Sequence, residues 1–481
     1  MNRPVVAAIA LAALSGCSLA PKYVQPALPV PTSWPVGDAY LRQSEAALPS
    51  VTYAQVFADP RLQQLIARAL VNNRDLRVAV ANIEAARAQY RIQRAERLPR
   101  VDTGADYSLS RSGGGNANTT GIGGSVSSGG GTNSRFSVDV GVTAFEIDLF
   151  GRIRSLTGAA LDRYFATEAA ARATRLTLVG DIADAWLQLA ADRSLLRLAQ
   201  QTVTVSEQSV RLTRARLQGG VSPRTDLAQA EQILATAQAD VAEQTTAVAQ
   251  DRNALELLVG APVEAPLLPM SIDEAAPRIV ALPAGVDSSV LLRRPDVVQA
   301  EYQLRAANGD IGAARAALFP RLSLTGVLGF ASNALTSLFS GGAFNFSAGP
   351  SIGYNIFSAG AGRANVALTQ AQRDAALATY ERSIQIAFRE TADALARQGT
   401  IEAQIAANRR FVAAAADTQR LTEARYRGGI DTFLASLDAQ RSLYAAQRTL
   451  VSTGLVGASN RVALYRALGG DSTLAALSPT P

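Results

Sequence analysis

Two long stretches of this sequence contain no proline, and they constrain the fold more than any other feature. Residues 152–218 and residues 361–427 lack the residue that most strongly breaks an α-helix. A continuous helix over either stretch would be ~100 Å long at about 1.5 Å per residue, whereas helices of globular proteins average about 11 residues. Helices of such length need partners along their whole length. The sequence therefore predicts coiled-coil packing rather than the several globular domains that its length would suggest.

Apolar residues recur inside these helices at the spacing of a packed face. One series has spacings of three and four, and another repeats every seven residues. We interpret the aromatic members Trp186 and Tyr444 as ordinary core residues rather than as a cofactor site. The two series are Leu176, Val179, Ala183, Trp186 and Ala190, and Leu437, Tyr444 and Val451.

The chain contains an internal duplication. The motif Ala-Arg-Leu-Gln-Gly-Gly-Val at 215–221 returns as Ala-Arg-Tyr-Arg-Gly-Gly-Ile at 424–430. Residues 151–260 match residues 360–469 at a constant offset of 209. Such a long period indicates a duplicated unit and not a short-period solenoid. Each copy is predicted to contain a helix, a strand, a loop, a strand, a very long helix, a tight turn and a final helix.

Each copy contributes two strand patterns with strict alternation of apolar and polar residues. They begin after residue 100 and near residue 136 in the first copy, and near residues 322 and 344 in the second. Alternation gives a strand one apolar and one polar face, and ~10 residues suffice for a tilted strand to cross a bilayer. Four strands cannot close a membrane barrel, which needs about 8, and lipid does not tolerate an open sheet edge. Either the strands form a small soluble sheet, or several chains share one barrel.

The N-terminal residues have the pattern of a secretory signal. A basic residue precedes an apolar run over 4–14 that is too short to span a bilayer. The run ends in Leu-Ser-Gly-Cys, which resembles a bacterial lipobox, and Cys17 is the only cysteine of the chain. We expect residues 1–16 to be removed and Cys17 to be lipidated; the alternative is a plain signal with an incidental cysteine. Several prolines then predict an extended, lipid-anchored segment over 17–60.

The composition argues against an enzyme. The chain has no histidine, one cysteine and a single lysine, Lys22. It therefore lacks the usual general base, the commonest metal ligand, and any internal disulfide or cysteine-based metal cluster. The formal charge is +6, but arginines alternate with acids and form no block that would track phosphates. We expect no catalytic residues, no cofactor, no metal and no nucleic-acid partner.

Together, these features resemble the TolC-like outer-membrane factors, in particular the lipoprotein branch that works with resistance-nodulation-division pumps. The resemblance covers essentially the whole mature chain. It rests on the lipobox, on the duplicated strand and helix blocks, and on two turn regions. The second turn reads Arg-Tyr-Arg-Gly-Gly-Ile-Asp at 425–431 and continues with Leu-Asp-Ala-Gln-Arg at 437–441. The first turn carries Gln-Gly-Gly-Val at 218–221 and Thr-Asp-Leu at 225–227.

The resemblance implies a mainly α protein with membrane β-strands. Each chain would supply two long coiled-coil helix pairs and four strands, and a homotrimer would form a 12-stranded β-barrel continued by an α-helical barrel. The protein would be anchored in the outer membrane by lipid and extend into the periplasm. Its partners would be a periplasmic adaptor (membrane fusion) protein and an inner-membrane resistance-nodulation-division pump.

The implied function is that of the outer-membrane channel of a tripartite efflux system, a passive exit duct for small molecules such as drugs and toxic organic compounds. Two alternatives remain open. One is an outer-membrane conduit for type I protein secretion. The other is a periplasmic coiled-coil scaffold lipoprotein with a soluble sheet.

The resemblance also implies a periplasmic aperture at the helical tips. Asp226 would be the tip acid of the first copy, with Tyr426 and Arg425 as its partners. Asp438 would belong to a ring of acids around the constriction. The alternatives are helix N-capping for Asp226 and a solvated helix face for Asp438.

Four glycines at the tips are expected to let the chain reverse with positive φ and to contact the adaptor. Some TolC-like proteins carry an arginine near the position of Asp431 and a second ring acid at that of Ala435. This departure leaves the role of Asp431 open. The glycines are Gly219, Gly220, Gly428 and Gly429.

The predicted division of the chain follows from these patterns. The segments are a signal peptide at 1–16, an extended anchored segment at 17–60, a first repeat at 61–260 with a β-hairpin at 101–149 and a tip turn at 218–223, a linker at 261–294, a second repeat at 295–470 with a β-hairpin at 321–358 and a tip turn at 427–432, and a C-terminal tail at 471–481.

Overall fold

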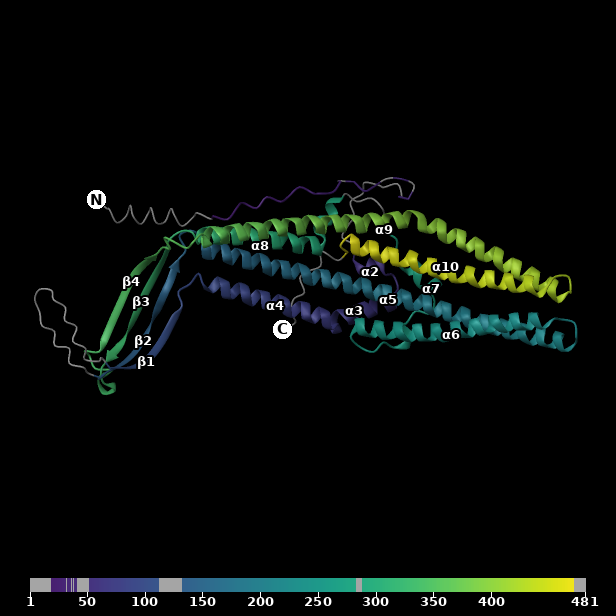
Figure 1. Cartoon of the computed structure of the whole chain (residues 1–481), viewed down its shortest axis with the longest axis horizontal. Helices are drawn as coiled ribbons and strands as arrows, with labels where there is room; N and C mark the ends of the chain where they lie inside the picture. Colours follow the sequence, from purple (N-terminus) through teal and green to yellow (C-terminus); the bar gives the residue numbers. More distant parts are fainter. Residues whose placement is uncertain are drawn as a thin grey trace, which may run out of the picture. The chain divides into compact units, whose positions relative to one another are not determined.

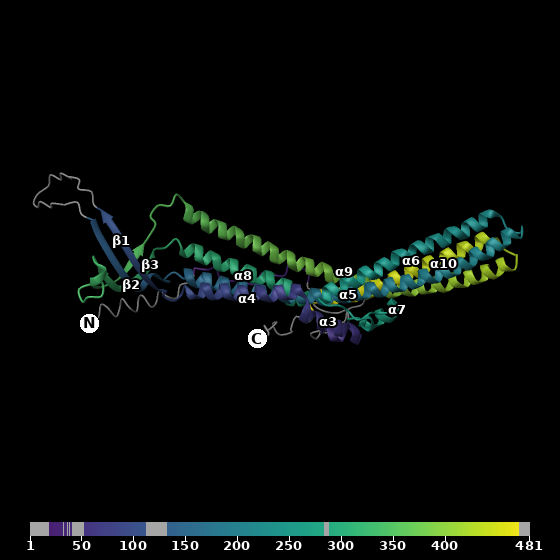
Figure 2. The same ribbon diagram turned by 90° about the horizontal axis from the view of Figure 1, so that it is seen from below.

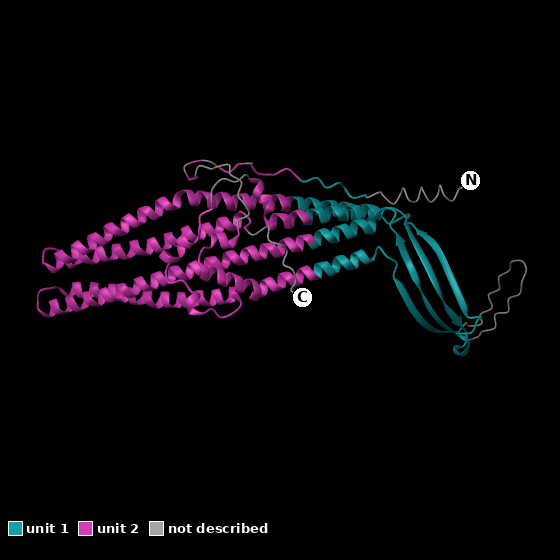
Figure 3. Ribbon diagram, turned by 180° about the vertical axis from the view of Figure 1, so that it is seen from behind, with its two compact units in different colours: residues 1–25, 85–164, 303–377 teal, residues 26–84, 165–302, 378–481 magenta. Residues whose placement is uncertain are grey.

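The computed structural model describes residues 19–31, 33–35, 37, 39–40, 52–111, 132–282 and 288–470. The expected signal peptide, the lipidation site Cys17 and the tail over 471–481 lie outside these residues. The chain forms two compact units, each built from segments that are distant in the sequence (Figure 3). Unit 1 comprises residues 1–25, 85–164 and 303–377, and unit 2 comprises residues 26–84, 165–302 and 378–481.

Unit 1 contains a four-stranded antiparallel sheet with the strand order β1-β2-β3-β4 (Figure 1). The hairpins of the two repeats join through β2 and β3, where Val138 lies opposite Phe330. The four predicted strands are confirmed, and their sequential order leaves β1 and β4 as the outer strands. The strands are β1 (Val101–Arg111), β2 (Thr132–Ile147), β3 (Arg321–Ser332) and β4 (Phe344–Gly353).

The sheet has the apolar face that the alternation predicts, and much of this face is exposed. In β4, Phe344, Phe346 and Ile352 are 57%, 67% and 74% exposed, and in β1 Leu109 is 61% exposed. Contiguous apolar surface of this kind marks a contact with another protein or with a membrane. Within the described residues, no other part of the chain buries these side chains.

The long helices form two antiparallel hairpins, which lie side by side (Figures 1 and 2). Helices α5 (Arg152–Gln218) and α9 (Ala361–Arg427) each have 67 residues, so both predicted proline-free helices are confirmed. Helices α6 (Arg224–Val259) and α10 (Phe433–Ala467) run back from their ends. In the described part of the chain, no helix is both long and apolar enough to cross a membrane.

Shorter elements precede and connect the hairpins. They are α2 (Tyr53–Val56), α3 (Pro60–Asn72), α4 (Arg74–Ala95), η1 (Ala265–Leu267), α7 (Ile272–Ala275), η2 (Ala276–Arg278), η3 (Ser288–Arg293), α8 (Pro295–Ala316) and η4 (Leu335–Ser337). The linker over 261–294, which joins the two repeats, contains η1, α7, η2 and η3.

Large aromatic residues form the core of unit 2. Trp186, Tyr380 and Tyr465 have no exposed surface, so the core prediction for Trp186 is confirmed. The prediction is wrong for Tyr444, which is half-buried and donates a hydrogen bond to Asp240. A buried phenol usually finds a hydrogen-bond partner for its hydroxyl, and here the carboxylate of Asp240 on α6 is that partner.

The N-terminal segment contains neither helix nor strand over residues 19–31. In unit 1, the carbonyl of Leu19 accepts a hydrogen bond from Arg315, and the guanidinium of Arg305 lies 4.8 Å from the ring centroid of Tyr23. In unit 2, Trp34 stacks on Phe388 with ring centroids 4.9 Å apart. The segment is thus held by side chains of the helices rather than by backbone pairing.

Candidate functional site

Both helical hairpins end in turns of the same construction. In the first, the amide of Gly220 donates to the carbonyl of Leu217, and the next amide donates to the carbonyl one residue earlier. In the second, Gly429 donates to Tyr426, and the following amide repeats the same pattern. This pair of bonds is the Schellman motif, which ends a helix on a residue in the left-handed conformation.

The left-handed residue is the second glycine of each pair. Gly220 has φ +72° and Gly429 has φ +74°, so the predicted positive φ is confirmed at these two positions. The first glycine of each pair, Gly219 or Gly428, does not have positive φ. A β-carbon at Gly220 or Gly429 would meet no atom within 4 Å, so backbone conformation rather than space requires glycine there.

The second turn is closed by an ion pair. The guanidinium of Arg425 donates two hydrogen bonds to the carboxylate of Asp431, at 2.6 and 3.0 Å. These bonds raise the pKa of Arg425 and hold the pKa of Asp431 below its usual value. The structure therefore gives Asp431 a partner across the Gly-Gly turn, and the six-residue spacing of the two charges was the available sequence signal.

Asp226 is engaged within the first turn. Its carboxylate accepts a hydrogen bond from the hydroxyl of Ser222 at 2.6 Å. The residue lies in the first turn of α6, where its negative charge interacts favourably with the helix dipole. The N-cap position itself is occupied by Pro223. Within the described part of one chain, Asp226 forms neither predicted contact: Arg425 binds Asp431, and the hydroxyl of Tyr426 has no hydrogen-bond partner.

Tyr426 joins the two tips through its ring. The guanidinium of Arg216, at the end of α5, lies 4.7 Å from the ring centroid, and the ring of Phe433 packs at 5.1 Å. Tyr426 is 6% exposed, and its hydroxyl has no hydrogen-bond partner among the described residues. The cluster around it comprises Val210, Ala230, Ile233, Phe433 and Leu437, with Leu227 and Leu234 at its margin.

The sequence did not single out Arg216, although it occupies the position equivalent to Arg425 in the duplication. Asp438 lies on α10 between the buried Leu437 and Ala439 and is itself exposed. Its carboxylate forms no hydrogen bond or ion pair within the described part of one chain. The tip is therefore an apolar cluster with one cation–π contact across the hairpins and a free carboxylate beside it.

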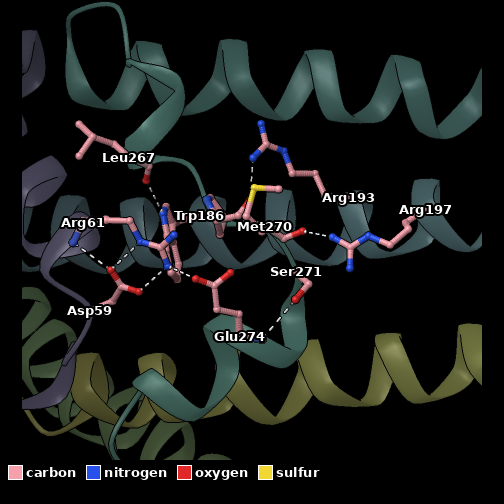
Figure 4. A network of polar contacts seen from close by, with 10 residues as sticks. Asp59, Arg61, Trp186, Arg193, Arg197, Leu267, Met270, Ser271 and Glu274 are labelled. Carbon is pink, nitrogen blue, oxygen red and sulfur yellow. Dashed lines mark hydrogen bonds and ion pairs between the residues drawn. The ribbon is translucent and has the colours of Figure 1, made fainter.

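The base of the first hairpin is held by a separate polar network (Figure 4). Arg61 at the start of α3 donates to Asp59 at 2.8 Å and to Glu274 at 2.7 Å. Its guanidinium also lies 5.6 Å from the ring centroid of Trp186, whose indole N–H donates to the carbonyl of Leu267 at 3.1 Å. The hydrogen bond to Asp59 is the main cause that raises the pKa of Arg61. This network ties α3, α5 and the linker together.

One face of α5 holds the linker between the repeats. Arg193 donates to the carbonyl of Pro269 at 2.7 Å, and Arg197 donates to the carbonyl of Met270 at 2.9 Å (Figure 4). Both arginines follow Trp186 at spacings that place the three side chains on one side of a helix. The first hairpin is thus anchored to the linker through α5.

Within the described residues, no group of three or more histidine, cysteine, aspartate or glutamate side chains is placed to hold a metal ion. The tip residues join the two helical hairpins of one chain.

Comparison with known proteins gives consistent matches over nearly the whole chain. The model of the family described as "Outer membrane efflux protein" matches residues 65–261 and 287–470. Each matched stretch contains one β-hairpin and one helical hairpin. The chain is 43% identical over 467 residues to the solvent efflux pump outer membrane protein SrpC of Pseudomonas putida, covering 96% of this chain and 97% of that protein.

Two further matches agree with this result. The outer membrane protein OprJ of Pseudomonas aeruginosa is 39% identical over 473 residues, covering 98% of this chain and 97% of OprJ. The crystal structure of the open state of the Neisseria gonorrhoeae MtrE outer membrane channel superposes with a TM-score of 0.82 at 35% identity. That match covers 94% of this chain and 98% of the MtrE chain.

Proposed function

This chain belongs to the outer membrane efflux protein family, and from this we propose that it is the outer-membrane channel subunit of a tripartite efflux system. It is a passive exit duct for small molecules such as drugs and toxic organic compounds. One observation carries the proposal: the same chain combines an unclosed four-stranded sheet with two 67-residue helices. Such helices extend ~100 Å, a length on the scale of the periplasm. The relative named for solvent efflux supports toxic organic compounds as cargo.

The sheet supports assembly as a homotrimer. The outer edges of β1 and β4 are unpaired within the described chain, and open edges are not tolerated in lipid. Three chains bring twelve strands, enough for a barrel with β4 of one chain beside β1 of the next. The exposed apolar face of the sheet then contacts the outer membrane, and the helical hairpins continue the duct into the periplasm.

The partners follow from the family. They are a periplasmic adaptor (membrane fusion) protein, which contacts the tip turns, and an inner-membrane resistance-nodulation-division pump, which supplies the energy. The protein performs no catalysis and needs no cofactor. The turns that meet the adaptor contain Gly219, Gly220, Gly428 and Gly429.

The tip residues form the periplasmic aperture. Asp226 and the Arg425–Asp431 pair stabilise the individual turns, and Tyr426 holds the two hairpins of one chain together. Threefold symmetry turns the exposed Asp438 into three carboxylates around one axis. Such a ring concentrates cations and repels anions, as acid rings do in cation channels.

The N-terminal end is anchored by lipid through Cys17, and the following extended segment runs along the body of the protein. The lone cysteine at the end of a lipobox-like motif supports this step. Cys17→Ser should leave an unprocessed or soluble periplasmic form that no longer incorporates labelled fatty acid. Acyl labelling that persists in the variant would contradict the anchor.

Export measurements test the function. Expression in a strain that lacks its own outer-membrane channel, together with a matching adaptor and pump, should restore resistance to toxic organic compounds. Purified protein should also conduct ions in planar bilayers. A protein-secretion conduit would restore export of a folded or unfolded polypeptide but not drug resistance, and a scaffold lipoprotein would conduct no current.

A further inference from the structure

The two hairpins of one chain touch at several levels between their bases and their tips. At the tips, Arg216 meets the ring of Tyr426. Further along α10, the hydroxyl of Tyr444 donates to the carboxylate of Asp240 on α6 at 2.6 Å. Tyr444 follows the first residue of α10 by ~17 Å of helix at about 1.5 Å per residue. The contact at Tyr444 therefore lies well away from the turns.

The contact at Tyr444 is charge-assisted and withdrawn from water. The side chain of Asp240 is 14% exposed, and a guanidinium nitrogen of Arg448 lies 3.5 Å from the same carboxylate oxygen. Burial and the hydrogen bond to Asp240 raise the pKa of Tyr444, so its phenol keeps the proton that it donates. Hydrogen bonds to a charged acceptor are about twice as strong as neutral ones. This contact is therefore stronger than a neutral hydrogen bond between the hairpins.

Between the tips and Tyr444, a neutral hydrogen bond from the amide of Gln440 on α10 to the hydroxyl of Ser206 on α5, at 3.2 Å, joins the hairpins beside a cavity. A cavity of about 400 Å³ is lined by Ile233 and Thr236 on α6, by Thr202 on α5, and by Gln440 and Tyr444 on α10. Helices that face a cavity have fewer dispersion contacts to lose when they separate. Separating the hairpins between the tips and Tyr444 thus costs less free energy than separating them at Asp240.

The polar contact belongs to one side of the duplication only. At an offset of 209, the equivalents of Tyr444 and Arg448 are Ala235 and Ala239, and the equivalent of Asp240 is Thr449. These residues cannot form a charged contact. The link between α6 and α10 therefore depends on side chains that occur only at these positions and not on the repeated backbone.

We propose that the contact of Asp240 with Tyr444 and Arg448 is a pivot. When the tips separate, the hairpins part between the tips and this contact and stay joined at the contact itself. This inference rests on the proposed channel function, because separation of the tips matters only if the helices line a duct. Asp240, Tyr444 and Arg448 are then positioning residues that set how far along the hairpins the opening extends.

A double-variant cycle in planar bilayers tests the pivot. Arg216→Ala releases the tip contact and should raise conductance over the wild type. Tyr444→Phe keeps the ring and removes only the pivot hydroxyl, so alone it should leave conductance unchanged, because the tips remain closed. Combined with Arg216→Ala, it should raise conductance by ~threefold or more above that of Arg216→Ala alone, a non-additive effect expected of coupled sites. Tyr90→Phe removes a hydroxyl from α4, outside both hairpins, and serves as the matched control.

The outcomes are distinct. If Tyr444→Phe alone opens the channel as much as Arg216→Ala does, the contact is a second latch and the pivot is wrong. If the two changes simply add, the contact is structural only and the pivot is also wrong. A wild-type protein and an Arg216→Ala variant that both fail to conduct would instead overturn the proposed function. The oligomer mass and melting temperature of each variant identify any that fail to fold.

Discussion

The two helical tips have the same backbone conformation but differ in their side chains. Both turns are Schellman motifs that end on a left-handed glycine, Gly220 or Gly429. Their arginines behave differently, however. Arg216 reaches across to the ring of Tyr426 on the other hairpin, whereas its equivalent Arg425 stays within its own turn and pairs with Asp431.

The difference follows from the residues at two matched positions. The position of Asp431 holds Ser222 in the first copy, so Arg216 has no equivalent carboxylate to bind. The position of Tyr426 holds Leu217 in the first copy, so only the second tip offers an aromatic face. Both copies thus keep a turn that depends on its left-handed glycine and tolerates different side chains at the neighbouring positions. The surrounding residues made one tip self-contained and the other dependent on its neighbour.

The largest expected effect comes from the shared backbone. Gly429→Val places a β-branched residue at φ +74°, which strains the backbone of the turn by about 1–3 kcal/mol. We expect drug export to be lost while the protein still reaches the outer membrane, as measured by resistance and by membrane fractionation. Gly428→Ala is the matched control, since Gly428 does not have positive φ, and it should be neutral. Normal export from Gly429→Val would contradict the role of the turn.

The next effect separates the ring of Tyr426 from its hydroxyl. Tyr426→Ala removes the aromatic face that joins the hairpins and should raise conductance in planar bilayers. Arg216→Ala should act in the same direction but less, since it removes only the cation–π contact, which contributes about 0.5–2 kcal/mol, and leaves the apolar cluster in place. Tyr426→Phe should match the wild type even together with Asp226→Ala, because the hydroxyl has no partner within one described chain. A large change in Tyr426→Phe would indicate a contact between chains.

A smaller effect concerns selectivity rather than opening. Asp438 has Gln229 as its equivalent, so only the second copy would place a carboxylate at the constriction. Asp438→Ala should lower the preference for cations, measured as the reversal potential in a salt gradient, with little change in conductance. Asp417→Ala, which removes another exposed acid from the same hairpin, should leave the preference unchanged. Equal shifts in both variants would mean that total charge, and not a ring, sets selectivity.

The smallest effect is the pH dependence of the second turn. The hydrogen bond from Arg425 depresses the pKa of Asp431 in the folded protein. The pair therefore stabilises the fold above the unfolded carboxyl pKa of ~3.9, and this stabilisation is lost as the pH falls through the depressed value. The melting temperature of Asp431→Asn should lie slightly below that of the wild type at neutral pH. The difference should shrink in high salt and vanish in strong acid, and a difference that grows in acid would be the wrong sign.

The periodic features of the fold were predictable, and the pairing at the tips was not. Proline-free length gave both 67-residue helices, and alternation gave the four strands, because these patterns depend on one residue type or one spacing. The left-handed glycines could also be predicted, although sequence alone could not say which glycine of each pair adopts the conformation. The partner of Arg425 depends on which of two carboxylates the folded turn brings closer. Helical spacing likewise cannot tell the core residue Trp186 from the hydrogen-bonded Tyr444.

The central claim is that one chain is an incomplete channel that three copies close. The most direct test is the mass of the purified protein in mild detergent, by light scattering or native mass spectrometry. The account predicts a single species of three chains, each slightly lighter than the 50.4 kDa of the full sequence. A monodisperse monomer that gives no cross-linked species would contradict it, because the exposed edges of β1 and β4 would then remain open.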